Sequence, residues 1–194
     1  MKQYFTNNDN LDLNKEITLS FEYYNNKLLF KSNDGLFSKD ELDKNSILLL
    51  NNIDSNNYQH ILDLGCGYGF IGICLSKRFN TKVDFIDVTN QAIYYTKKNC
   101  LLNNIDNYQV IQSDGVKNIN KYDLITLNPP IHAGKEVCYT LYQESYEHLT
   151  SNGSLIIVIN KKHGALSTIE YLKTLGQVII KYKKKQTYII ELTR

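Results

Sequence analysis

The segment Asn-Pro-Pro-Ile-His-Ala-Gly-Lys, residues 128–135, follows an apolar stretch, residues 122–127, that is typical of a buried strand. Prolines donate no backbone hydrogen bond, and an asparagine at the carboxyl end of a strand needs partners for its side-chain amide. The segment is therefore either a plain turn or a rigid loop whose oxygen atoms accept from a ligand. The side-chain carbonyl of Asn128 and the backbone carbonyl of Pro129 would suit a flat NH2 group, and Pro130 would stiffen the loop.

A glycine-rich loop lies upstream in Leu-Asp-Leu-Gly-Cys-Gly-Tyr-Gly-Phe-Ile-Gly, residues 62–72. Read from Gly67 it contains G-x-G-x-x-G, and Asp87 ends the next predicted strand, so a dinucleotide fits formally. Any adenosine cofactor needs glycines for close approach and an acid for its ribose hydroxyls. Asp63, directly before the glycines, suits an ammonium and a sulfonium better than a pyrophosphate. The loop therefore favours S-adenosylmethionine over a nicotinamide cofactor.

Strand and helix patterns alternate around these motifs. They predict strands at 60–65, 82–87, 108–112, 122–127 and 154–159, and helices at 70–79, 90–102 and about 135–149. This alternation predicts an α/β fold with a Rossmann-like, doubly wound and mostly parallel sheet, and a ligand site at the carboxyl ends of its strands. Residues 176–193 are predicted to add an antiparallel edge hairpin.

The N-terminal part carries two further signals. Residues 18–32 alternate around Asn25-Asn26, which predicts a short β-hairpin. Ser38 and Glu41 have the spacing of a capping box, which predicts a helix beginning near Asp40. Residues 1–15 are rich in asparagine and are expected to form a flexible segment, with residues 16–194 as a single domain.

Composition narrows the class of protein. The chain has 194 residues, 42% hydrophobic and 22% charged, which is typical of a globular domain. No apolar run approaches the roughly 18 residues that span a bilayer, and no signal peptide is evident, so a cytoplasmic protein without membrane contact is expected. Its four cysteines are widely separated, which predicts small buried residues and no metal site. Lysines cluster at 161–162 and 181–185, either as a solvated hairpin edge or as a positive field for nucleic acid.

Four motifs in this order resemble the class I methyltransferases, and specifically the small-subunit ribosomal RNA guanine-N2 methyltransferase family related to the enzyme RsmC. They are residues 63–69, 85–99, 112–115 and 128–135, and residues 33–50 resemble the segment that precedes the glycine loop in that family. The likeness covers roughly residues 16 to 194. Four separated motifs are far more specific than one glycine loop.

The resemblance implies a role for each matching residue. Asp63, Gly65, Gly67 and Gly69 would hold the methionine part of S-adenosylmethionine, Asp87 and Val88 the ribose, and Asp114 and Gly115 the adenine. Asn128, Pro129, Pro130 and Ile131 would form the catalytic loop, with Asn128 also contacting the cofactor, and His132, Lys135, Lys161 and Lys183 would contact RNA. Purely structural alternatives remain for three of these residues: a turn for Asp114, a helix cap or turn for Asp87, and a surface or capping histidine for His132.

The predicted activity is methyl transfer to an exocyclic amine, guanine N2 of 16S ribosomal RNA, with ribosomal RNA or the small subunit as partner. Ile131 stands where adenine-methylating enzymes often carry an aromatic residue, so adenine N6 stays open, as does a protein glutamine amide. More remote alternatives are an NAD-dependent oxidoreductase and a non-catalytic RNA-binding module. Larger members of the resembled family carry an additional RNA-recognition domain, so the choice of substrate is open. Monomer and homodimer also both stay open.

Overall fold

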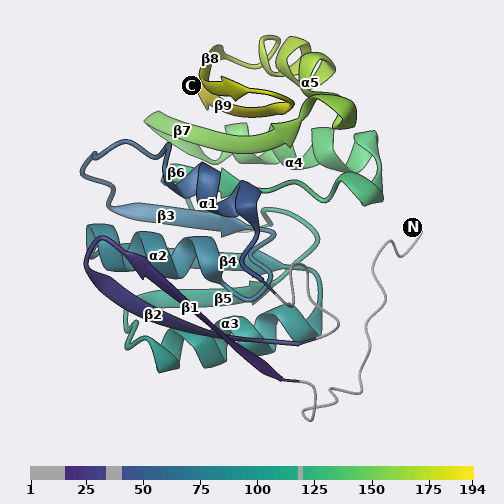
Figure 1. Cartoon of the computed structure of the whole chain (residues 1–194). Helices are drawn as coiled ribbons and strands as arrows, with labels where there is room; N and C mark the ends of the chain where they lie inside the picture. The colour runs from purple at the N-terminus through teal and green to yellow at the C-terminus, as the bar shows by residue number, and fades with distance from the viewer. Residues whose placement is uncertain (1–15, 34–40, 118–119) are drawn as a thin grey trace.

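The computed structural model describes residues 16–33, 41–117 and 120–194, so the predicted flexible segment 1–15 lies outside the described residues. Seven strands form one sheet in the order β5-β4-β3-β6-β7-β9-β8 (Figure 1). The strands are β3 (His60–Leu64), β4 (Lys82–Asp87), β5 (Tyr108–Gln112), β6 (Tyr122–Leu127), β7 (Leu149–Asn160), β8 (Gln177–Lys184) and β9 (Thr187–Thr193). β3 to β7 run parallel to one another, and β9 pairs antiparallel with both of its neighbours, β7 and β8. The predicted mostly parallel sheet with an antiparallel C-terminal edge is confirmed.

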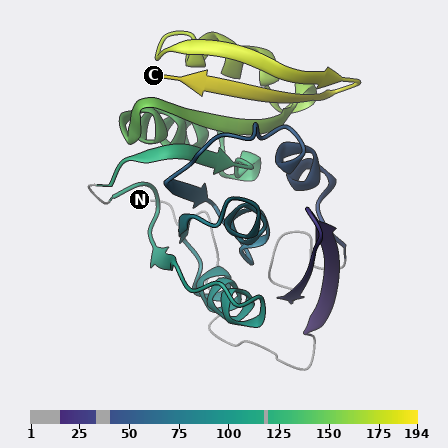
Figure 2. The same cartoon turned by 90° about the vertical axis from the view of Figure 1, so that its left-hand side faces the viewer.

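Helices cover both faces of the sheet. They are α1 (Lys44–Leu50), α2 (Phe70–Phe79), α3 (Asn90–Leu102), α4 (Lys135–Glu147) and α5 (Ala165–Leu172), with 3-10 turns η2 (Ile131–Ala133) and η3 (Lys161–His163). Ile61 on β3 packs into the core under α1 to α3, whereas the next residue, Leu62, packs into the core under α4 and α5. Successive strand residues point to opposite faces, so the sheet is buried on both sides. Figure 2 shows α1 and α4 on opposite sides of the sheet.

The helix α1 begins later than its local pattern predicts. Ser38 and Asp40 lie outside the described residues, but Glu41 is described and precedes the helix. The helix begins at Lys44, and Asp43 is its N-cap, with a side chain that accepts from Ser46 N at 2.7 Å. The expected start near Asp40 is wrong because aspartate at position 43 satisfies the free donors of the first turn.

The N-terminal hairpin is confirmed as a separate two-stranded sheet of β1 (Ile17–Tyr23) and β2 (Asn26–Ser32). Its turn residues are Tyr24 and Asn25, with φ of 46° and 61°, so the turn lies one residue before the expected Asn25-Asn26 pair. Asn26 pairs with Tyr23 as a strand residue. Its amide donates to the carbonyl of Tyr24 at 2.9 Å, which holds that residue in the left-handed region.

Asn99 of α3 and Asn103, the C-cap residue of that helix, bind the free edge of β2. Asn103 accepts from Leu29 N at 3.0 Å and donates to Leu29 O at 2.7 Å, and Asn99 makes the same pair of bonds with Lys31 at 2.7 and 2.9 Å. Four helical residues rise about 6 Å and two strand residues about 6.8 Å, so the two amides match alternate strand positions. The two side-chain amides therefore make the hydrogen bonds that the backbone of a third strand would make with β2.

The C-terminal half holds two differences from the predicted pattern. The helix α5 was not predicted, because the charged run before it, Lys161 to His163, was interpreted either as a solvated hairpin edge or as a positive field for nucleic acid. The strand β7 begins at Leu149, not at 154, and pairs with β6 through a register shift between Tyr122 and Leu124. Helix α4 consequently ends at Glu147.

The four cysteines are all buried and unpaired with one another, as expected for small core residues. None of the helices in the described part of the chain is long and apolar enough to cross a membrane.

Replacing Asn103 by alanine should weaken the docking of the hairpin. The change leaves both backbone groups of Leu29 without their partner, which should lower the free energy of unfolding by about 1 to 3 kcal/mol. Urea unfolding measures this loss, and Lys97→Ala on the exposed face of the same helix is the control. Equal stability of the two variants would show that the amide contributes nothing.

Candidate active site

The glycine loop connects β3 to α2 and is anchored to the neighbouring strand. Gly65, Gly67 and Gly69 have φ of 69°, 56° and 83°, which favours glycine at each position. The N–H groups of Gly65 and Cys66 donate to the carbonyl of Ile86 at 2.8 and 3.0 Å. A Cβ added to Gly67 would meet no atom within 4 Å, so this part of the loop presents open backbone. The loop is thus a fixed ribbon with space beside it.

Gly72 has a different purpose from the loop glycines. A Cβ at this position would lie 2.3 Å from the ring of Phe85, so glycine lets α2 pack closely on β4. The third glycine of the formal G-x-G-x-x-G pattern therefore serves helix packing.

Asp87 ends β4 and holds the loop in place. One carboxylate oxygen accepts from Gly67 N at 3.0 Å, and the other accepts from the backbone and hydroxyl of Thr89 at 3.0 and 3.1 Å. Burial raises the pKa of Asp87, and these donors oppose the shift. The turn role considered for Asp87 is present, and its ribose role stays a prediction. Val88 follows it, half-buried, with its carbonyl accepting from Gln112 Nε2 at 3.1 Å.

Asp63 lies beneath the loop, only 2% exposed. Its carboxylate accepts from Gly72 N at 2.8 Å and from Thr126 Oγ1 at 3.2 Å. Gly69, the N-cap of α2, offers no side chain, so Asp63 supplies the capping oxygen for the first turn. Burial raises the pKa of Asp63 to about 7. Its predicted contact with the methionine part of a cofactor stays a prediction, because both oxygens already have protein partners.

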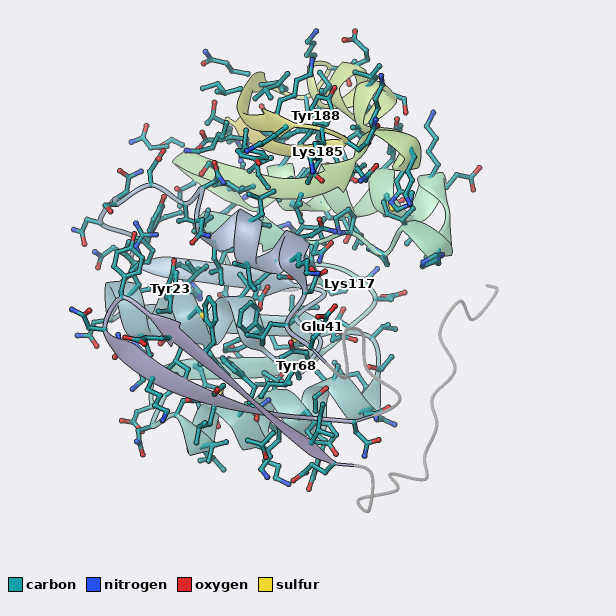
Figure 3. All side chains as sticks on the ribbon, in the orientation of Figure 1. Tyr23, Glu41, Tyr68, Lys117, Lys185 and Tyr188 are labelled. Carbon is teal, nitrogen blue, oxygen red and sulfur yellow. The ribbon has the colours of Figure 1, made fainter. Side chains whose placement is uncertain are left out.

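The loop after β5 carries Asp114 and Gly115. Asp114 is exposed and pairs with Lys117 at 3.4 Å. Gly115 is buried, and a Cβ there would lie 2.1 Å from Glu144 Oε2, which accepts from Val116 N at 2.9 Å. Glu144 on α4 therefore fixes this loop, a role that no local pattern reveals. Figure 3 labels Lys117 at the edge where the parallel strands end.

The loop after β6 begins beside the glycine loop. β3 and β6 are parallel neighbours in which Leu64 is level with Leu127, so Gly65 and Asn128 leave adjacent strands at the same height. Adjacent strands are about 4.8 Å apart. The predicted cofactor loop and the predicted catalytic loop therefore lie next to each other.

The two prolines form a tight turn. Pro130 has φ of −75° and ψ of 74°, and Ile131 N donates to Pro129 O at 2.9 Å, which is an inverse γ-turn. The expectation of a fully free carbonyl at Pro129 is wrong to this extent, because one of its two lone pairs is used internally. Ile131 is half-buried at the start of η2.

The amide of Asn128 is half-buried and has a defined orientation. Nδ2 donates to Asp43 Oδ2 at 2.9 Å and to Ser46 Oγ at 3.1 Å. Oδ1 has no hydrogen-bond donor among residues 16–33, 41–117 and 120–194. The side-chain oxygen of Asn128 is therefore an available acceptor at this strand end. Asp43 and Ser46 come from α1, which sequence patterns had not connected with the site.

A small cavity of about 110 Å³ lies beside the catalytic loop, between α4 and α5. Residues of both regions line it: Ile131, Gly134, Lys135, Cys138, Tyr139, Tyr142, Ile159, His163, Gly164, Ser167 and Thr168. Lys135 is exposed, with Nζ 5.0 Å from the ring centre of Tyr139, and His132 is exposed and lies outside the cavity lining.

The two lysine clusters meet in space. Lys161 N donates to Gln186 O at 2.6 Å, which places η3 against the turn between β8 and β9. We name the exposed members of the two clusters together the basic ridge: Lys161, Lys162, His163, Lys183, Lys184 and Lys185. Figure 3 labels Lys185 and Tyr188, whose ring lies 5.4 Å from Lys183 Nζ. Lys181 differs from this group, because its largely buried side chain pairs with Asp54 and Glu191.

A family model described as methyltransferase small domain matches residues 27–191. The chain belongs to this family. Membership confirms the predicted class I methyltransferase fold and S-adenosylmethionine as its cofactor, and it favours them over the nicotinamide alternative. Among curated members, the uncharacterized protein YbxB of Bacillus subtilis is 39% identical over 98% of this chain and 97% of its own length.

Other relatives are larger methyltransferases. Ribosomal RNA small subunit methyltransferase C of Pseudomonas entomophila is 35% identical over 65% of this chain and 40% of its own length. The structure of the 16S rRNA N2 G1207 methyltransferase RsmC from T. thermophilus, in complex with AdoMet and guanosine, matches with a TM-score of 0.81 at 20% identity. That match covers 93% of this chain and 51% of the other. The chain thus spans about two fifths to one half of these methyltransferases.

The groups at the carboxyl ends of the strands fit a methyltransferase cofactor. Open backbone at Gly67, a half-buried carboxylate at Asp87 and the exposed carboxylate of Asp114 lie after three neighbouring strands. These acceptors suit ribose and adenine hydrogen-bond donors, and the negative charge suits a cation. In the described part of the chain no group of three or more histidine, cysteine, aspartate or glutamate side chains could hold a metal ion.

Stability should depend on pH through Asp63, which is close to Asp87 and to the buried thiols of Cys66, Cys74 and Cys100. Because its folded pKa is about 7 and its ordinary value 3.8, Asp63 contributes most below pH 4, and this stability is lost as pH rises to 7. Asparagine at position 63 does not titrate, so this pH-dependent contribution to stability is absent in Asp63→Asn. The unfolding free energy of the wild type minus that of Asp63→Asn should fall by on the order of a few kcal/mol between about pH 4 and pH 7.

Urea unfolding of both proteins from about pH 4 to pH 8 measures this difference. Asparagine at position 63 keeps one acceptor for Gly72 N, and the Thr126 hydroxyl is able to accept from its NH2 group, so the variant should fold. The exposed Asp106, replaced by asparagine, controls for loss of a carboxylate. If the unfolding free energies of Asp63→Asn and wild type change in parallel with pH, the raised pKa of Asp63 is contradicted.

Proposed function

We propose that the chain transfers a methyl group from S-adenosylmethionine to the exocyclic N2 of a guanine in small-subunit ribosomal RNA, in the cytoplasm. The observation that carries the proposal is the oriented amide of Asn128, whose oxygen has no donor among the described residues and stands level with the start of the glycine loop. The names of the RsmC relatives support RNA and guanine as the target.

Several residues would hold the cofactor on this proposal. Gly65 and the open backbone of Gly67 would receive its methionine part, Asp87 the ribose and Asp114 the adenine. When bound, S-adenosylmethionine supplies an electrophilic methyl group on a positively charged sulfur. Asp63 contributes by holding the first turn of α2, and hence the end of the glycine loop, in position.

Asn128 would act on the target amine. The lone pair of guanine N2 is delocalised into its ring, so attack gains from an acceptor that orients the N–H groups and stabilises the charge that develops on nitrogen. Oδ1 of Asn128 offers that acceptor. The Pro129 carbonyl keeps one lone pair for a second contact. The alkylated amine is acidic, and water takes its proton, so no side-chain base is required.

The same acceptors would hold adenine N6 or a glutamine amide, because all are planar NH2 groups. Ile131, which follows the turn, is aliphatic and half-buried and would pack against a base without ring stacking. The identity of the methylated nucleoside therefore decides between guanine and adenine.

The basic ridge would bind RNA phosphates. It flanks the cavity that Ile131 and Lys135 also line, since His163 belongs to both. Phosphate contacts fix the orientation of a nucleic acid without reading its bases. A target guanine in folded RNA must be unpaired or extruded to reach Asn128. His132, Lys135, Lys161 and Lys183 remain the proposed RNA contacts.

Replacing Asn128 by alanine should lower kcat by about 10² to 10³, as removal of one preorganised hydrogen bond does elsewhere, while the Kd for S-adenosylmethionine stays within a few fold. Transfer of labelled methyl to ribosomal particles stripped of methylation, followed by nucleoside analysis, measures both rate and product. N2-methylguanosine is the expected product. Gln143→Ala on α4 controls for loss of an amide away from the site. Full turnover in Asn128→Ala, or another labelled nucleoside, would refute the assignment.

Removing charge from the basic ridge should weaken RNA binding and flatten its salt dependence. Each phosphate that is no longer neutralised in Lys161→Ala and Lys183→Ala should reduce the slope of log K against log salt by about 0.7 to 0.9. Fluorescence anisotropy with a 16S RNA fragment between about 50 and 200 mM salt measures the slope. Lys121→Ala, directly before β6 at the amino ends of the parallel strands, should leave it unchanged. An unaltered slope in the variant that carries both Lys161→Ala and Lys183→Ala would show that the basic ridge does not bind RNA phosphates.

A further inference from the structure

The helix α1 contacts the catalytic loop through its N-cap residue. Asp43 precedes Asn128 by 85 residues, yet one of its carboxylate oxygens, Oδ2, accepts from Asn128 Nδ2 at 2.9 Å. The same oxygen accepts from the backbone N–H and the hydroxyl of Ser46 at 2.7 and 2.8 Å. Ser46 Oγ is itself a second acceptor for Asn128, at 3.1 Å. Asp43, Ser46 and Asn128 therefore form a closed group of three side chains.

This group allows one orientation of the Asn128 amide. An amide can rotate by half a turn and exchange its NH2 group for its oxygen. Here the exchanged orientation would place Oδ1 against the carboxylate of Asp43, oxygen against oxygen, with no hydrogen between them. With Nδ2 toward Asp43, Oδ1 must point the other way. Asp43 thus decides which atom Asn128 presents at the end of β6.

We propose that Asp43 is a positioning residue for methyl transfer, which fixes the amide of Asn128 and strengthens its oxygen as an acceptor. This inference rests on the proposed function. A carboxylate that accepts from Nδ2–H polarises the amide and places more negative charge on Oδ1. The effect is useful where positive charge develops on the target nitrogen. Asp43 itself touches neither the cofactor nor the amine.

The rest of α1 holds Asp43 in place. Leu49 and Leu50 are fully buried in the core, and Ser46 is 7% exposed. At the other end of the helix, Tyr23 Oη donates to Leu50 O at 3.3 Å, and Arg78 donates to Tyr23 Oη at 3.2 Å. A seven-residue helix has little stability of its own, so these contacts are what keep it at this angle. The carboxylate of Asp43 therefore approaches Asn128 from a fixed support.

The competing interpretation is that Asp43 merely caps α1. Serine separates the two roles, because it caps a helix about as well as aspartate but carries a shorter, neutral side chain. In Asp43→Ser the cap remains and the charge beside Nδ2 is lost. In Asp43→Asn the side-chain length and one acceptor remain, so part of the orientation should be retained.

Steady-state methylation of stripped ribosomal particles tests the inference. In Asp43→Ser, kcat should fall by about ten- to hundredfold, the scale found when residues that orient the ligands of a metal are replaced. The KM for RNA, the Kd for S-adenosylmethionine and the melting temperature should change little. Asp43→Asn should lie between this variant and wild type. Asp54→Ser, an exposed acid beyond the other end of α1, is the matched control and should keep wild-type kcat.

The side-chain NH2 signals of Asn128 in ¹⁵N NMR spectra give a readout independent of activity. They should shift in Asp43→Ser and stay unchanged in Asp54→Ser. Wild-type kcat in Asp43→Ser alongside a strongly impaired Asn128→Ala would overturn the inference while leaving the proposed function intact. If wild type transfers no methyl group to ribosomal RNA, the proposed function fails. The NMR signals still decide whether Asp43 orients the amide, and unchanged signals overturn that claim.

Discussion

The buried carboxylate of Asp63 ties together the three elements from which the site is built. It belongs to β3, accepts from Gly72 in the first turn of α2, and accepts from Thr126 near the end of β6. The glycine loop runs between Asp63 and Gly72, and Asn128 follows Thr126 by two residues. Two hydrogen bonds and the positive end of a helix offset part of the cost of burying this acid, and the remaining cost keeps the pKa of Asp63 raised. Its position therefore sets the distance between the two loops.

The sequence predicted the central elements well because their signals are local. β4 and α3 have the expected bounds, and Thr89, directly before α3, is its N-cap, with a side chain that accepts from Ala92 N. The start of α1 was misplaced because Ser38 and Glu41 have the spacing of a capping box, whereas the observed N-cap, Asp43, has a serine three residues on and so lacks that pattern. The contact of Asp43 with Asn128 favours the observed start, and it comes from a distant part of the chain. The helix α5 was not predicted, because attention to the charge of the lysines before it left its own short apolar pattern unassigned.

The candidate site divides in the same way. Asp63, Asp87 and Asn128 were found from sequence because each ends or nearly ends a predicted parallel strand, and such ends meet at one edge of a sheet. Asp43 and Glu144 were missed because they reach their partners from other elements, across 85 and 28 residues. No short pattern carries such information. The internal bond of the Pro129 carbonyl is a matter of local backbone geometry that composition does not specify.

The way in which the hairpin docks has a consequence for how this protein can evolve. Asn99 and Asn103 contact the main chain of β2, and a main chain is the same for every residue except proline. Substitutions at the outward positions of β2 should therefore leave these contacts intact, whereas replacement of either asparagine should remove them. Asn99 also donates to the carbonyl of Tyr68 within the glycine loop, so its loss would disturb ligand capture and hairpin attachment together. Selection should act far more strictly on the helix than on the strand.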